Sequence, residues 1–220
     1  MTVGAQVEPD SRPLVLFDFG NVLALHDRLE ICGRLSVHSS LSAQEVCARI
    51  FETEIEYDSE TGKYDSREHF RRIKSAIGGD PGWSYDEFVD EFKNVFTLND
   101  EAVTALVHAA QDCRVFILSN ISYVHSRWLF EQEILATVPE SYILSYKVSV
   151  MKPDPQIWRI ALSRSGVSAA RTLFVDDSGD NCAAAQELGI RSIHYRKGVT
   201  DLDGEIDRWI REISLSTVND

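Results

Sequence analysis

The chain has 220 residues, of which 44% are hydrophobic and 26% are charged, a composition typical of a globular protein with a substantial core. With 35 acidic and 22 basic residues, the formal net charge is −13, which argues against general binding to nucleic acid or to an anionic membrane. A small anionic substrate is still compatible with this charge, because a few local cations can govern one pocket.

The ends of the chain and its cysteines bear on where the protein works. Residues 1–12 lack the cationic start and apolar run of a signal peptide, and no stretch approaches the roughly 20 apolar residues of a membrane helix. We therefore expect flexible termini at 1–12 and 215–220, a cytoplasmic location and no membrane partner. Four widely spaced cysteines without a CxxC pair predict reduced, mostly buried thiols. These are Cys32, Cys47, Cys113 and Cys182.

Short apolar runs predict the strands of a parallel sheet. The first covers 13–17 and ends abruptly at Asp18. The other predicted strands are 115–118, 142–146, 172–175 and 190–194, and the helices between them are 99–110, 154–165 and 181–188. Asn99 is expected to cap the first of these helices. Short strands alternating with helices predict an α/β fold with a doubly wound parallel sheet covered on both faces.

The segment between the first strand and residue 99 has a different pattern. It contains no convincing strand and three helical stretches, at 42–57, 65–77 and 84–96. The last begins with a capping box, in which Ser84 is followed three residues later by Glu87. We predict a core domain formed by 13–24 and 99–214, and an inserted α-helical cap domain at 25–98.

Polar residues follow the predicted strands at one edge of the sheet. They are Asp18, Ser119–Asn120 and Asp176–Asp177, and Lys152 follows the third strand. In an open parallel sheet, ligands bind outside the carboxyl ends of the strands. Three carboxylates gathered there would repel one another unless a cation joined them. This edge is therefore the predicted functional site.

The same residues carry a resemblance to a known family. The segments 17–22, 118–120, 152–153 and 175–177 stand in the order and approximate spacing of the four motifs of the haloacid dehalogenase (HAD) superfamily. The likeness spans residues 13–196, and the insertion resembles the helical cap of small sugar-phosphate phosphatases. The first motif, Phe-x-x-Gly-Asn-Val, is similar to that of bacterial enzymes acting on glucose 1-phosphate. The resemblance implies a Mg²⁺-dependent phosphatase of a small phosphorylated metabolite.

The resemblance also implies a nucleophile and a metal site. Asp18 would attack phosphorus to give an aspartyl-phosphate, which water then hydrolyses. Mg²⁺ would be held by Asp18, the backbone carbonyl of Gly20 and Asp177. Asp176 and Asn181 would support the site, Asn181 by positioning Asp177.

Three further residues would bind the phosphate. By resemblance, Ser119 offers its hydroxyl, Asn120 its backbone N–H and Lys152 its positive charge. His26 lies near the proposed site in sequence and is interpreted as a flap or loop residue. The tryptophans are expected to be packing residues: Trp83, Trp128, Trp158 and Trp209.

One position departs from the pattern of the superfamily. Most of its phosphatases carry an acid two residues after the nucleophile, where this chain has Gly20. General acid–base help is worth about 10²–10⁴ in rate. Two alternatives therefore stay open, a metal-independent haloacid dehalogenase and a catalytically weak binding protein with the same fold. The sequence leaves both a monomer and a homodimer open.

Overall fold

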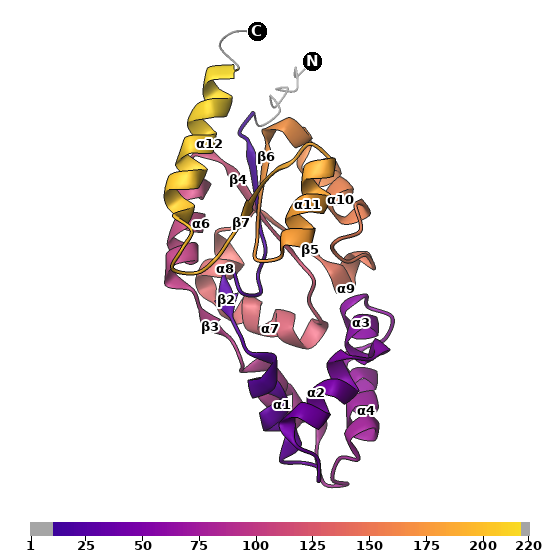
Figure 1. The fold of residues 1–220 in the computed structure, drawn as a ribbon. Helices are drawn as coiled ribbons and strands as arrows, with labels where there is room; N and C mark the ends of the chain where they lie inside the picture. The colour runs from indigo at the N-terminus through magenta and orange to yellow at the C-terminus, as the bar shows by residue number, and fades with distance from the viewer. Residues whose placement is uncertain (1–10, 217–220) are drawn as a thin grey trace, which may run out of the picture.

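Five parallel strands form the central sheet, in the order β5-β4-β1-β6-β7. The computed structural model describes residues 11–216, so most of the predicted flexible termini lies outside the described residues. The strands are β1 Leu14–Phe17, β4 Arg114–Ser119, β5 Ser141–Leu144, β6 Thr172–Asp176 and β7 Arg191–His194. The predicted doubly wound α/β fold is confirmed, with helices on both sides of the sheet (Figure 1).

Alternating residues of β1 show how the two faces are covered. Val15 and Phe17 point into one apolar cluster, which includes Trp209 of α12, whereas Leu14 and Leu16 point into another. All four side chains are fully buried. Such a strand is apolar at every position because helices cover both faces of the sheet. The helices of the first face are α6 Asp100–Asp112 and α12 Leu202–Ser216, and those of the second are α10 Gln156–Ser165 and α11 Gly179–Glu187 (Figure 1).

Several smaller elements of the core were not predicted. They are α7 Tyr123–Glu131, α8 Glu133–Thr137, α9 Ser145–Val148 and the 3-10 turn Ala169–Arg171. Helix α9 takes up residues 145–146, which were predicted to end the third strand. Asn99 precedes α6, but its side chain makes no capping bond. Its amide donates instead to the Val22 carbonyl at 2.7 Å and to the Tyr195 hydroxyl at 2.8 Å, so Asn99 takes the predicted N-cap position but does not cap the helix through its side chain.

Five helices, called the cap helices below, fill the insertion. They are α1 Arg28–Ser36, α2 Ala43–Phe51, α3 Glu54–Glu60, α4 Ser66–Ile77 and α5 Tyr85–Lys93. They share an apolar cluster, which Val124 of α7 joins, and they gather at one end of the core (Figure 1). The capping box of Ser84 and Glu87 is confirmed. The predicted helix 42–57 is two helices, because Thr53 caps α3 and interrupts the run. The division into a core and a cap domain stays a prediction.

Two short strands, β2 Ala24–Leu25 and β3 Thr97–Leu98, pair antiparallel where the chain leaves and re-enters the core. The expectation of no strand between the first core strand and residue 99 is therefore wrong. A strand of two residues shows no hydrophobic period, so a pattern argument cannot find it.

Close contacts hold the cap helices against the core. The ammonium of Lys93 lies 2.7 Å from a carboxylate oxygen of Glu131 in α7. Gly62, at φ +70°, lies against the backbone carbonyl of Tyr146, where a Cβ would overlap it. This glycine therefore supports both a left-handed turn and a close approach.

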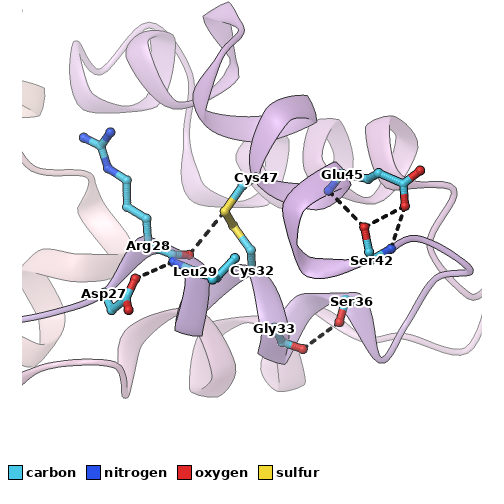
Figure 2. The surroundings of a disulfide bond; sticks show 9 residues. All are labelled: Asp27, Arg28, Leu29, Cys32, Gly33, Ser36, Ser42, Glu45 and Cys47. Carbon is cyan, nitrogen blue, oxygen red and sulfur yellow. Dashed lines mark hydrogen bonds between the residues drawn. A yellow bond between two sulfur atoms is a disulfide. The ribbon is translucent and has the colours of Figure 1, made fainter.

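A disulfide joins Cys32 of α1 to Cys47 of α2 (Figure 2). The prediction of reduced thiols is wrong for this pair, whereas Cys113 and Cys182 are free and buried. The helices bring the two Cα atoms to 5.4 Å, a separation typical of disulfides that sequence spacing does not reveal. Disulfides persist mainly in oxidising compartments, so the bond does not support the cytoplasmic prediction.

Within residues 11–216, no helix has the length and apolar character needed to cross a membrane.

The four tryptophans are buried, with 8% or less of each exposed, as predicted for packing residues.

Candidate active site

A buried lysine joins the carboxyl ends of two neighbouring strands. Asp18 follows β1 and Asp176 ends β6, and the register that pairs Phe17 with Val175 brings these aspartates side by side. The Lys152 ammonium lies 2.8 Å from Asp18 Oδ1 and 2.6 Å from Asp176 Oδ2. Each of the three residues is at most 7% exposed. Sheet geometry thus brings together charges that lie far apart in the sequence.

Asp176 anchors this arrangement from inside the core. One of its oxygens accepts from the Ser178 backbone N–H at 2.8 Å, and the Asn181 amide donates to both oxygens at 3.0 and 3.2 Å. Asn181 was expected to position Asp177, and the structure places its amide on Asp176 instead. The reason is that Asn181 lies in the first turn of α11, which points back at the end of β6.

Three carboxylates come close enough to share a metal ion. Ligand oxygens of Asp18, Asp176 and Asp177 lie within 4.8 Å of one another, and Asp177 is the exposed member. Mg²⁺ takes oxygen ligands at about 2.0–2.1 Å and keeps several waters, so a donor set of this kind and size fits it. Both oxygens of Asp176 already accept bonds from Lys152, Ser178 or Asn181, whereas Lys152 and the Phe19 N–H both bond to Oδ1 of Asp18. Asp18 and Asp177 are therefore the better candidate ligands.

The charges in the site shift one another's protonation. Burial raises the pKa of Asp18 to about 7, against the opposing effect of Lys152 and with a further increase from Asp176. Burial alone would lower the pKa of Lys152, but the charges of Asp18 and Asp176 outweigh it and raise that pKa. The lysine is therefore charged at neutral pH, and a second cation beside Asp18 would favour its ionised form.

The second predicted motif positions the lysine loop. The Asn120 side chain donates to the Lys152 carbonyl at 2.9 Å and accepts from the Lys152 N–H at 2.8 Å. The sequence predicted a role only for the backbone N–H of Asn120, so this pair of side-chain bonds was not predicted. Ser119 is 1% exposed, and its hydroxyl donates to the Asn120 carbonyl at 3.3 Å. The peptide bond between Lys152 and Pro153 is cis.

A cleft of about 640 Å³ opens over these groups. Its walls include Asp18, Gly20 and Asp177, and also His26 and Arg28 from the start of the cap helices. A smaller cavity of about 200 Å³ shares Gly20, His26 and Arg28 with it and is lined by residues of both the cap helices and the core. The site therefore has two compartments, of which the sequence predicted the first.

Gly20 and His26 are in close contact at the junction. A Cβ at position 20 would lie 3.2 Å from His26 Cε1, so the imidazole fills the space beside the glycine. His26 was interpreted as a flap or loop residue, and it lines both compartments. A side chain at position 20 would require the ring to move. This is a physical reason for the glycine in the first motif.

Comparison with known proteins identifies the family. A sequence model of haloacid dehalogenase-like hydrolases matches residues 13–189. The chain therefore belongs to this family of hydrolases, as the four motifs predicted.

Individual relatives are distant but cover most of the chain. A D-ribitol-5-phosphate phosphatase of Bacteroides thetaiotaomicron is 24% identical over 191 residues, which are 84% of this chain and 92% of that protein. A sesquiterpene phosphatase of Aspergillus oryzae is 26% identical over 183 residues, which are 81% and 87%.

Solved structures share the fold. A HAD family enzyme from Bacteroides thetaiotaomicron superposes with a TM-score of 0.77 at 23% identity, covering 86% of this chain and 96% of that one. A complex of the same enzyme with magnesium and inorganic phosphate superposes with a TM-score of 0.72 at 21% identity, covering 87% and 98%.

Proposed function

We propose that the chain is a Mg²⁺-dependent phosphatase of small phosphomonoesters, with Asp18 as the nucleophile. The observation that carries the proposal is the Lys152 ammonium, held 2.8 Å from Asp18 Oδ1 with Asp177 close by. Two curated relatives are phosphatases, and a related fold has been crystallised with magnesium and phosphate, which supports the same reading.

Each residue of the site would have its own role in phosphoryl transfer. Asp18 Oδ1 accepts from the Lys152 ammonium at 2.8 Å and from the Phe19 N–H at 2.7 Å. These two contacts fix the position of the carboxylate in the cleft. Lys152 would offset charge on the transferring phosphoryl group, while Ser119 and the Asn120 N–H would bind its oxygens. Positioning and charge neutralisation of this kind are what phosphoryl transfer mainly requires.

Asp18, Asp177 and the Gly20 carbonyl would hold the Mg²⁺. When bound, the ion supplies positive charge to the phosphate oxygens and the developing transition state. Asp176 would act through Lys152, whose position it fixes from within the core.

A metal-independent dehalogenase is the second candidate, because Gly20 removes the acid that most phosphatases of the superfamily carry. The exposed Asp177 carboxylate beside Asp18 disfavours it, since a reaction without metal has no use for a second acid at that edge.

The test is phosphate release from a panel of small phosphomonoesters, with and without Mg²⁺, by the wild type and Asp18→Asn. We expect Mg²⁺-dependent release by the wild type and a loss on the order of 10⁴-fold or more in the variant, with an unchanged fold by circular dichroism. Halide release from haloacids without metal would favour the dehalogenase. Equal activity of the two proteins would instead favour a binding protein.

A further inference from the structure

The cavity between the cap helices and the core contains an unusual group of polar atoms. Glu56 Oε1, His125 Nε2 and His26 Nδ1 are buried and have no hydrogen-bond partner in the described part of the chain. All three residues line this one cavity of about 200 Å³. Buried polar groups in native proteins almost always have a partner, so three orphans around one space point to a ligand.

Glu56 is held in place through one of its two carboxylate oxygens, while the other has no hydrogen-bond partner in the described part of the chain. It is 6% exposed, and its Oε2 lies 3.0 Å from His69 Nε2. His69 is held in turn by Ser59, whose hydroxyl lies 3.0 Å from its Nδ1. Burial acts to raise the pKa of Glu56, but the nearby histidines and Arg28 outweigh it and lower that pKa. The carboxylate is therefore ionised, and Oε1 can only accept a hydrogen bond.

His125 presents a second acceptor from the core side. It is 7% exposed and stacks on Phe92 of α5, with ring centroids 4.3 Å apart. Burial lowers the pKa of His125 to about 4, and its ring also bonds to the Phe92 backbone. A neutral imidazole that uses one nitrogen as the backbone donor has its other nitrogen, Nε2, as an acceptor.

We infer that this cavity binds the leaving group of a polyhydroxylated phosphomonoester, a polyol or sugar phosphate, whose hydroxyls donate to Glu56 Oε1 and His125 Nε2. The inference rests on the proposed function, since the phosphate would lie in the adjoining compartment beside Asp18. The apolar walls, among them Phe51 and Phe96, would contact the carbon chain.

An isoprenoid leaving group fits the cavity poorly. It has no donors, so it would leave the acceptors of Glu56 and His125 buried and unpaired. A site built to bond a hydroxyl can reject an analogue that lacks it by as much as about 10⁴–10⁵-fold. The polar atoms therefore favour the polyol side of the two chemistries represented by the phosphatase relatives.

The experiment compares kcat/KM for ribitol 5-phosphate, farnesyl monophosphate and phenyl phosphate in the presence of Mg²⁺. We expect the wild type to prefer ribitol 5-phosphate over farnesyl monophosphate by at least about 100-fold. In Glu56→Gln and in His125→Phe, the ratio of the ribitol to the phenyl value should fall at least about tenfold, mainly through KM. The matched control is Glu52→Gln, an exposed glutamate at the end of α2, which should leave the ratio unchanged.

A preference for farnesyl monophosphate, or an unchanged ratio in both variants, would overturn the inference. If the wild type releases phosphate from none of the three substrates, the proposed function fails instead. Calorimetric binding of ribitol then decides the inference alone. Binding that Glu56→Gln weakens supports the cavity, and no binding overturns it.

Discussion

The sheet edge and the cavity beside the cap helices both contain buried polar groups, but these groups differ in whether the protein supplies their partners. At the sheet edge, Lys152 joins Asp18 and Asp176 directly, so the charges are paired before any ligand arrives. In the cavity, Glu56 and His125 each keep an acceptor without a protein partner. From this difference we infer that the groups that would act on every phosphomonoester are held in position by contacts within the protein. Groups that would recognise one kind of leaving group depend on the ligand to complete them.

Removing the lysine should break the paired region most severely. In Lys152→Ala, Asp18 and Asp176 lose their buried cation, so we expect kcat/KM for phosphate release to fall about 10²–10³-fold. Urea unfolding should show a loss of about 3–5 kcal/mol, because breaking a buried ion pair leaves uncompensated charge. The exposed Lys197→Ala serves as the control. Near-normal kinetics in Lys152→Ala would remove this lysine from the site.

The disulfide should matter for the cap helices more than for the sheet edge. Cys47→Ser opens a loop with a sequence separation of 15 residues, and we expect a loss of about 2–3 kcal/mol in unfolding free energy. Under reducing conditions the wild type and the variant should become alike. If native protein prepared without reductant shows four reactive or titratable thiols after unfolding, instead of two, the bond is absent.

Asp177 is proposed to be a metal ligand, whereas the nearby Asp180 is not. Asp177→Asn should raise the Mg²⁺ concentration for half-maximal activity at least about tenfold, because even partners of metal ligands are worth 10–100-fold in affinity. Asp180→Asn is the matched control, since Asp180 is exposed and lies in the first turn of α11. Unchanged metal dependence in Asp177→Asn would contradict its role as a ligand.

Protons should compete with Mg²⁺ at the sheet edge. Burial raises the pKa of Asp18 to about 7, and a metal ligand must be deprotonated. We expect Mg²⁺ affinity, measured by calorimetry, to weaken up to about tenfold from pH 7 to pH 6 and to level off above pH 8. Without metal, the free energy of unfolding should fall as the pH rises from 3.8 to about 7. In this range the Asp18 carboxyl is ionised in the unfolded chain but protonated in the folded protein. Flat metal affinity across this range would refute the assignment.

The carboxylates and Ser119 of the sheet edge could be predicted because each lies at or just after the end of an apolar strand, whereas Lys152 lies in a loop after α9. The strand ends at Asp18, Ser119 and Asp176 were read from hydrophobic runs, and a parallel sheet brings such ends together. Helix α12 could also have been predicted, because Leu202, Ile206 and Trp209 recur at helical spacing on its buried face.

The cavity could not be predicted in the same way. Glu56 and His125 lie on helices far apart in the sequence, and they meet only because the cap helices dock against α7. The pairing of Cys32 with Cys47 likewise depends on how two helices pack. One feature could have indicated the cavity. Glu56 is a charged residue on the buried face of the short helix α3.

The most direct test of the account is to trap the bond that Asp18 is proposed to form. Wild-type protein turning over a phosphomonoester with Mg²⁺ is quenched in acid, reduced with borohydride and analysed by peptide mass spectrometry. An aspartyl-phosphate at Asp18 would be converted to homoserine at that position, and we expect to find it only when substrate is present. The account would be contradicted if phosphate is released while Asp18 is recovered unmodified, or if homoserine forms from a different aspartate.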